Sequence, residues 1–116
     1  MGVVYHGNYL RLFEIARTEL LRSIGLPYSV LEDSGYMLPV LESYAKYILP
    51  ARYDDLLALD AQIVRAVSAS FTISYQILRD DVTLVYGWTR HAFVTADQFK
   101  PIRPPKVFID TVMEAV

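Results

Sequence analysis

The chain has 116 residues, of which 53% are hydrophobic, and its formal net charge is −2. This length is that of one ordinary domain, and the hydrophobic content excludes an intrinsically disordered chain. The slight negative charge gives no sign of a nucleic-acid surface, and the absence of cysteine excludes disulfides, thiolate catalysis and cysteine-based metal sites.

The same composition limits cofactors and location. His6 and His91 are the only histidines, so a metal site built from histidines of one chain is not expected, and no other cofactor is indicated. No apolar run approaches the roughly 18 residues of a membrane span, and no signal peptide is recognised, so we expect a cytoplasmic protein. The mean hydropathy of +0.26 is high for a small monomer and points to a buried subunit interface.

The first predicted element is a long amphipathic helix. Asn8 is a good N-cap, Gly25 a good C′ residue, and Pro27 prevents the helix from resuming. Between them, apolar residues recur at helical spacing: Leu10, Phe13, Ala16, Leu20, Leu21 and Ile24. On the polar side, Glu14 is expected to pair with Arg17 three residues later. Residues 28–35 read as a loop with one turn of helix.

Four strands with short turns follow. Alternating patterns predict strands over 41–49, 57–63, 70–77 and 83–95, with a hairpin turn at residues 79–81. Asp54 and Asp55 are assigned to a turn rather than to acid/base chemistry. Gly87 within the last strand predicts close approach of another backbone, for which the first helix is the candidate. His91 is expected to be a packed sheet residue. A short helix over 106–115 closes the chain. We therefore expect an α+β domain, with an antiparallel sheet wrapped around the first helix.

The string Tyr5-His6-Gly7-Asn8 just ahead of the helix is the main functional signal. A helix start offers unpaired N–H groups and the positive end of the helix dipole, which can stabilise a developing oxyanion. A titratable histidine at that position indicates a catalytic site. The structural alternative is a histidine that only caps the helix.

This string resembles hotdog-fold acyl-CoA thioesterases of the 4-hydroxybenzoyl-CoA thioesterase-like group. The matching residues are Gly2-Val3-Val4-Tyr5-His6-Gly7-Asn8-Tyr9, Phe13-Glu14, Ala16-Arg17-Thr18-Glu19, Pro50-Ala51-Arg52-Tyr53-Asp54-Asp55 and Lys100-Pro101. The resemblance implies a hotdog fold over residues 1–116, hydrolysis of an acyl-CoA substrate, and a homodimer or homotetramer with the site between subunits. It implies neither nucleic acid nor a membrane span.

One departure from the family pattern matters. The family motif reads Asp-x-x-Gly-Val-Val-Tyr-His, with the catalytic Asp three positions before the residue that corresponds to Gly2. This sequence begins one residue before Gly2. We expect that the catalytic Asp and the first strand of the fold lie upstream of Met1.

The resemblance also implies roles for four residues. A backbone N–H near His6 would bind the carbonyl oxygen, and His6 would orient the thioester or assist the leaving thiolate. Tyr5 is either a wall of the site or part of the dimer seam, and Asn8 is a helix cap first and a site residue second. Glu14 is the fallback carboxylate, although its pairing with Arg17 is the preferred interpretation. The sequence leaves open whether the phosphates of coenzyme A contact the basic residues Arg52, Lys100, Arg103 and Lys106.

Two other functions remain open. One is a non-catalytic acyl-CoA-binding protein of the same fold. The other is a hotdog enoyl-CoA hydratase or dehydratase, in which His6 and Glu14 would act together.

Overall fold

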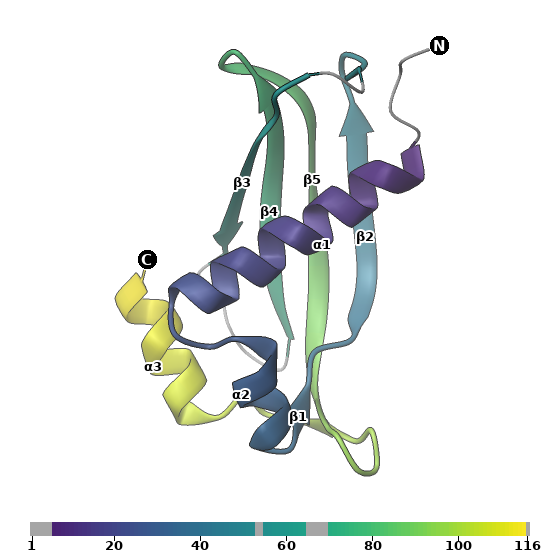
Figure 1. The fold of residues 1–116 in the computed structure, drawn as a ribbon. Coiled ribbons are helices and arrows are strands. Elements are labelled where there is room, and N and C mark those ends of the chain that lie inside the picture. The colour runs from purple at the N-terminus through teal and green to yellow at the C-terminus, as the bar shows by residue number, and fades with distance from the viewer. Residues whose placement is uncertain (1–5, 53–54, 65–69, 116) are drawn as a thin grey trace.

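The computed structural model describes residues 6–52, 55–64 and 70–115. Two helices, four main strands and a last helix follow one another in the predicted order, with two short additional strands (Figure 1). Their bounds are α1 His6–Ser23, α2 Tyr28–Asp33, β1 Tyr36–Met37, β2 Val40–Tyr47, β3 Ala58–Ile63, β4 Ser70–Arg79, β5 Val82–Thr95, β6 Pro101–Ile102 and α3 Lys106–Ala115. The predicted strands are confirmed to within two residues, and the pairs formed by β1 and β6 were not predicted.

The sheet is antiparallel, with the four long strands in the order β2-β5-β4-β3. β1 and β6 both pair with the last residues of β5. α1 crosses one face of this curled sheet obliquely, as Figure 1 shows. The expected α+β hotdog arrangement is therefore confirmed.

Local signals explain the ends of the elements. Gly25 has φ +85°, its N–H donates to the carbonyl of Arg22, and Leu26 N–H donates to that of Leu21, which is the Schellman arrangement. Asp80 and Asp81 both have positive φ, as a two-residue hairpin turn of type I′ requires. Both predicted breaks are confirmed.

Two rings fix α1 on the inner face of the sheet. Phe13 is 1% exposed and stacks on Tyr75 of β4, with ring centroids 4.5 Å apart. Gly87 makes room for this contact, because a Cβ there would lie 2.0 Å from the carbonyl oxygen of Tyr44 and 2.9 Å from the Phe13 ring. The predicted close approach of a backbone is confirmed, but it is the backbone of β2, and the helix contributes a side chain.

β2 and β3 form the two edges of the four-stranded sheet. In β2 only Ala45 is partly buried, and the other seven residues are exposed. An edge strand has N–H and C=O groups without partners, and these can pair with another chain. Folded domains usually protect such an edge, so an edge strand that is also exposed on both faces is unusual. Within the described residues, nothing covers this edge.

Candidate active site

The helix start that carries the predicted site residues begins at His6. α1 thus already includes Asn8, so the prediction that Asn8 is the N-cap is wrong. A cap residue has non-helical backbone angles, whereas Asn8 lies inside the first turn. Tyr5 and the side chains of His6 and Asn8 lie outside what the structure describes. The backbone places His6 and Asn8 together in the turn whose N–H groups have no partner within the helix.

Tyr9 holds this end of α1 against the sheet. Its side chain is 2% exposed, and its hydroxyl accepts a 3.1 Å hydrogen bond from the backbone N–H of Ala51. Its ring also packs against Tyr47 at the end of β2, with centroids 5.2 Å apart. Because both partners belong to β2 and the loop that follows it, the start of α1 is fixed close to the open sheet edge (Figure 1). The sequence analysis missed Tyr9, although it stands in the recognised string.

Glu14 lies two turns further along α1, and its side chain is exposed. The predicted ion pair with Arg17 is wrong, because Arg17 points toward the sheet. Its Nε donates to the hydroxyl of Tyr28 at 2.8 Å and its Nη1 to that of Tyr75 at 3.2 Å. Burial acts to lower the pKa of Arg17, but the two tyrosine oxygens outweigh it and the net shift is upward. Among the described residues, Glu14 forms no ion pair, so its carboxylate is free to meet another group.

Arg17 ends a buried chain of hydrogen bonds that runs to His91. Tyr75 and Thr89 hydroxyls lie 2.6 Å apart, Thr89 Oγ1 lies 2.8 Å from His91 Nε2, and His91 Nδ1 lies 3.2 Å from the carbonyl of Leu38. His91 is fully buried, and this burial lowers its pKa to about 4. The interpretation of His91 as a packed sheet residue is confirmed. The imidazole is enclosed, and its two hydrogen-bond partners, Thr89 and the carbonyl of Leu38, do not belong to α1.

Asp55 also has a structural role. Its carboxylate accepts from the backbone N–H of Arg52 at 2.8 Å and pairs with Arg79 at 2.9 Å. The hydrogen bond from Arg52, followed by that from Arg79, lowers the pKa of Asp55. The assignment of Asp55 to a turn is confirmed, whereas Asp54 lies outside the described residues.

The four basic residues considered for coenzyme A do not form one patch. Arg52 is in the loop after β2, close to the start of β5, whereas Lys100 pairs with Thr95 at the far end of β5. Arg103 and Lys106 follow Lys100. A strand the length of β5 separates the two groups, so they cannot hold the same phosphate.

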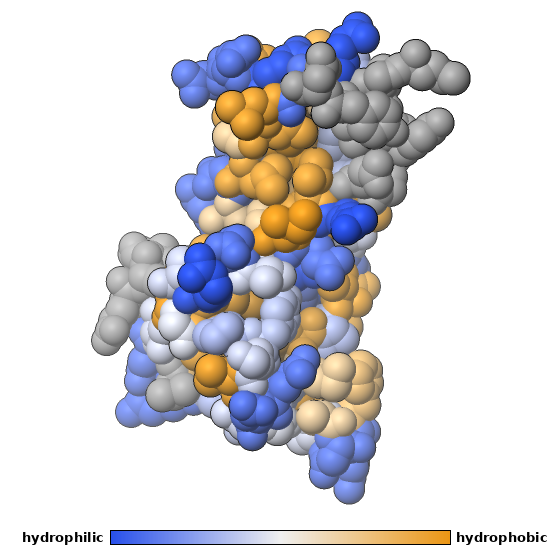
Figure 2. Space-filling view, in the orientation of Figure 1, coloured by the Kyte–Doolittle hydropathy of each residue, from blue (hydrophilic) through white to orange (hydrophobic). Residues whose placement is uncertain are grey.

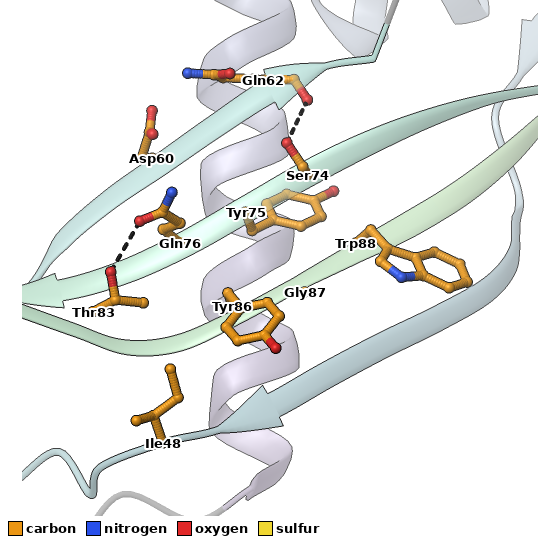
Figure 3. Close-up of a pocket in the computed structure, with 10 residues that line it drawn as sticks. All are labelled: Ile48, Asp60, Gln62, Ser74, Tyr75, Gln76, Thr83, Tyr86, Gly87 and Trp88. Carbon is orange, nitrogen blue, oxygen red and sulfur yellow. Dashed lines mark hydrogen bonds between the residues drawn. The ribbon is translucent and has the colours of Figure 1, made fainter. Parts of the chain in front are cut away.

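A cavity of about 520 Å³ lies on the face of the sheet away from α1 (Figure 3). Its lining contains Asp60 but no histidine, and it has no contact with the start of α1. The described residues contain no cluster of three acids or histidines that could hold a metal. The start of α1, which carries the recognised string, therefore lies apart from this cavity and close to the β2 edge.

Comparison with known proteins decides the family. A model of the thioesterase superfamily matches residues 1–86, which is most of the chain. The chain belongs to the thioesterase superfamily.

Three individual proteins each match 90% or more of this chain. The acyl-CoA thioesterase YbgC of Haemophilus influenzae is 31% identical over 106 residues, which make up 90% of this chain and 78% of that protein. The DHNA-CoA thioesterase of Staphylococcus aureus superposes with a TM-score of 0.90 at 25% identity, over 99% of this chain and 80% of the other. A hypothetical protein of Aquifex aeolicus gives a TM-score of 0.89 at 34% identity, over 96% and 86% of the two chains. The expected membership of the hotdog thioesterases is confirmed.

None of the described helices of this thioesterase is long and apolar enough to cross a membrane.

Proposed function

We propose that the chain hydrolyses acyl-CoA thioesters, giving a free acid and coenzyme A. The observation that carries this proposal is the start of α1 at His6, fixed beside an open sheet edge by Tyr9. Membership of the superfamily and the acyl-CoA activity in the names of its relatives support it. The proposed location is the cytoplasm.

The proposed roles follow the geometry of a helix start. Backbone N–H groups of the first turn receive the thioester oxygen as it becomes an oxyanion, which is worth on the order of 3 kcal/mol per donor. His6 orients the thioester and assists the leaving thiolate. Tyr5 forms a wall of the site, and Asn8 contacts the substrate from the same turn.

The attacking water needs a carboxylate, and Glu14 of the same chain is badly placed to supply it. Eight residues separate Glu14 from His6, which corresponds to about 12 Å along a helix axis. A general base must act within about 3 Å of the water that it activates. We therefore assign this role to the Asp expected three positions before Gly2, and we keep Glu14 as the fallback through a second subunit.

The site is proposed to form between two subunits. An antiparallel pair of β2 strands would satisfy the open edge and cover its apolar side chains. Large hydrophobic residues around β2 are about half exposed: Val40 47%, Leu41 48%, Tyr44 43%, Ile48 49% and Leu49 43%. Joining these edges brings the second subunit next to the start of α1.

The other sheet edge is proposed to receive the first strand of the fold. A groove of about 360 Å³ runs between α1 and β3, and Ile15, Leu20, Leu59 and Ala61 contribute its apolar lining. Figure 2 shows apolar side chains gathered over β3 beside α1. In this proposal the first strand of the fold pairs with β3, covers this groove and carries the Asp of the family motif to the start of α1.

The test measures free thiol released from a panel of acyl-CoA substrates. Residues 1–116 are compared with the same chain carrying the proposed first strand and Asp ahead of Gly2, here called the upstream segment. We expect turnover only with the upstream segment, and a loss of about 100-fold or more in kcat for His6→Ala. Glu14→Gln is the control and is expected to change kcat by less than about threefold.

Each other outcome identifies a different function. Binding without thiol release would identify a non-catalytic acyl-CoA-binding protein. Addition of water to an enoyl-CoA would identify a hydratase. If residues 1–116 alone are fully active and Glu14→Gln abolishes this activity, Glu14 is the carboxylate that activates the water.

A further inference from the structure

The loop between β2 and β3, here called the β2–β3 loop, is attached to the sheet where it begins. Its described residues are 48–52 and 55–57. The backbone N–H groups of Ile48 and Leu49 both donate to the carbonyl of Leu84 in β5, at 2.8 and 3.1 Å. Figure 1 shows the loop crossing the end of the sheet at which β4 and β5 are joined. The strand β5 therefore fixes the first residues of the loop.

Asp55 attaches the second half of the loop to the sheet. Its Oδ2 accepts a hydrogen bond from the N–H of Arg52 at 2.8 Å and another from Nη1 of Arg79 at 2.9 Å. The N–H of Asp55 donates in turn to the carbonyl of Arg52 at 3.1 Å. Arg79 is the last residue of β4, and the Asp55 side chain is only 16% exposed. Hydrogen bonds to a carboxylate are stronger than those between neutral groups. One side chain therefore closes the loop on itself and joins it to β4.

Between these two attachments the loop holds the first turn of α1. Tyr9 is the residue of that turn whose side chain the structure describes. Its hydroxyl accepts from the N–H of fully buried Ala51, which directly precedes Arg52, and its ring packs on Tyr47. A continuous path therefore leads from the end of β4 through Asp55 and the loop to the start of α1.

The sequence of the first turn does not by itself favour a well-formed helix start. Gly7 lies in this turn, and glycine has a low helix propensity because it loses the most backbone freedom. The turn carries no acidic side chain that would interact favourably with the helix dipole. Helix ends fray where few contacts hold them. The contact between Tyr9 and the β2–β3 loop therefore has to keep this turn in place.

We propose that Tyr9 and Asp55 are positioning residues for the hydrolysis, an inference that rests on the proposed function. Neither side chain is assigned a contact with the substrate. Asp55 acts through the loop, because its Oδ2 already accepts from two donors. Together the two residues hold the N–H groups of the first turn within about 2.7–3.1 Å of the developing oxyanion. A displacement of about 1 Å can cost on the order of 100-fold in rate.

The kinetic effect of losing this position follows from where the oxyanion exists. It develops in the transition state and not in the bound substrate, so misplaced donors lower kcat and leave KM unchanged. Tyr9→Phe keeps the ring on Tyr47 but removes the hydroxyl that accepts from Ala51. Thiol release is measured with the form of the chain that turns over, residues 1–116 or the form with the upstream segment. We expect kcat to fall about tenfold or more, with KM within about twofold of the wild type.

The matched control is Arg17→Met on the same helix. Arg17 binds the hydroxyls of Tyr28 and Tyr75 about three turns from His6. Loss of these bonds should lower the stability as much as Tyr9→Phe does, without moving the first turn, so kcat should stay within about threefold of the wild type. A fall in kcat equal to that of Tyr9→Phe would mean that lost stability explains both results, and it would overturn the positioning role.

Two variants of Asp55 test the other end of the path. Asp55→Ala removes the acceptor shared by Arg52 and Arg79, and should lower kcat about tenfold at an unchanged KM. Asp55→Asn keeps an oxygen that can accept both bonds, and kcat should return to within about threefold of the wild type. Because both residues act through one loop, the double variant Tyr9→Phe/Asp55→Ala should lie within about threefold of the slower single variant. Losses that multiply to about 100-fold would overturn the shared path.

Amide hydrogen exchange tests the attachment without an activity assay. In an α-helix the N–H groups of residues 10–12 bond to the carbonyls of residues 6–8, so their exchange reports on the first turn. Relative to residues 14–16, exchange at residues 10–12 should be about tenfold faster in Tyr9→Phe and Asp55→Ala, and unchanged in Arg17→Met.

The possible results separate this inference from the proposed function. Unchanged exchange in Tyr9→Phe and Asp55→Ala would overturn the positioning role even if kcat falls. An active wild type with the same kcat in both variants would overturn the positioning role and leave the hydrolase intact. A wild type without turnover in either form would overturn the proposed function, and the catalytic role of both residues with it.

Discussion

Acidification between pH 6.5 and pH 4 should destabilise this protein through His91. The carbonyl of Leu38 can only accept, so Nδ1 of His91 donates to it, and Nε2 accepts from the hydroxyl of Thr89. The same order continues outward, with Tyr75 donating to Thr89 and Arg17 donating to Tyr75. A proton on Nε2 would reverse these bonds and leave the Tyr75 hydroxyl facing a guanidinium that cannot accept.

The magnitude follows from the pKa of His91, which burial lowers from 6.5 to about 4. Between these values the unfolded chain binds a proton that the folded chain does not bind. The contribution of His91 to the free energy of unfolding is therefore fully present above pH 6.5, and it decreases as the pH falls below this value. One pKa unit corresponds to about 1.4 kcal/mol, so the total loss by pH 4 is about 3 kcal/mol. At lower pH the loss from this group stops, because both states carry the proton.

The measurement is urea denaturation of the wild type and of His91→Gln, at half-unit steps from pH 7.5 to pH 4. The free energy of unfolding of the wild type should fall with a slope that approaches 1.4 kcal/mol per pH unit near pH 5. His91→Gln should be less stable at pH 7.5 and show a much smaller slope. Asp55 contributes little to the slope above pH 4.5, because its usual pKa of 3.8, which the unfolded chain keeps, and its lowered pKa in the folded chain both lie below this range. A wild-type stability that is constant from pH 6.5 to pH 4.5, or an equal slope in both proteins, would refute the reasoning.

Three substitutions test the contacts that position α1, each by its free energy of unfolding. Gly87→Ala places a methyl group 2.0 Å from the carbonyl oxygen of Tyr44, which is a backbone atom of the paired strand and cannot move aside. The free energy of unfolding should therefore fall by an amount at the upper end of the about 1–3 kcal/mol typical of overpacking, or by more. A fall of less than about 1 kcal/mol would show that the two strands can separate. Tyr9→Phe removes the acceptor for the N–H of fully buried Ala51 and should cost about 1–3 kcal/mol; an unchanged stability would mean that water replaces the hydroxyl. Arg17→Met should cost about 1–3 kcal/mol, because Tyr75 and Tyr28 lose a charged donor; a gain in stability would show that burial of the guanidinium outweighs both bonds.

Patterns that depend on neighbouring residues were predictable. Gly25 and Pro27 end α1 because both act through their own backbone, and alternation in β4 marks its buried face without reference to any distant residue. The residues that were mispredicted depend on distant partners. The sequence shows Glu14 three residues before Arg17, but the hydroxyls of Tyr28 and Tyr75 lie 11 and 58 residues away, and these hold the guanidinium instead. The choice of Asn8 as cap failed because residues before it can also adopt helical angles.

The sequence by itself determined the elements, the curled sheet on a long helix, and the family, since periodicity, turn residues and the string around His6 are local properties. Only the tertiary structure decided that β2 stays exposed on both faces, and that the His91 ring lies between the carbonyl of Leu38 and the hydroxyl of Thr89 with a lowered pKa. These properties depend on which strands are neighbours, and strand order is set by packing between residues far apart in the chain.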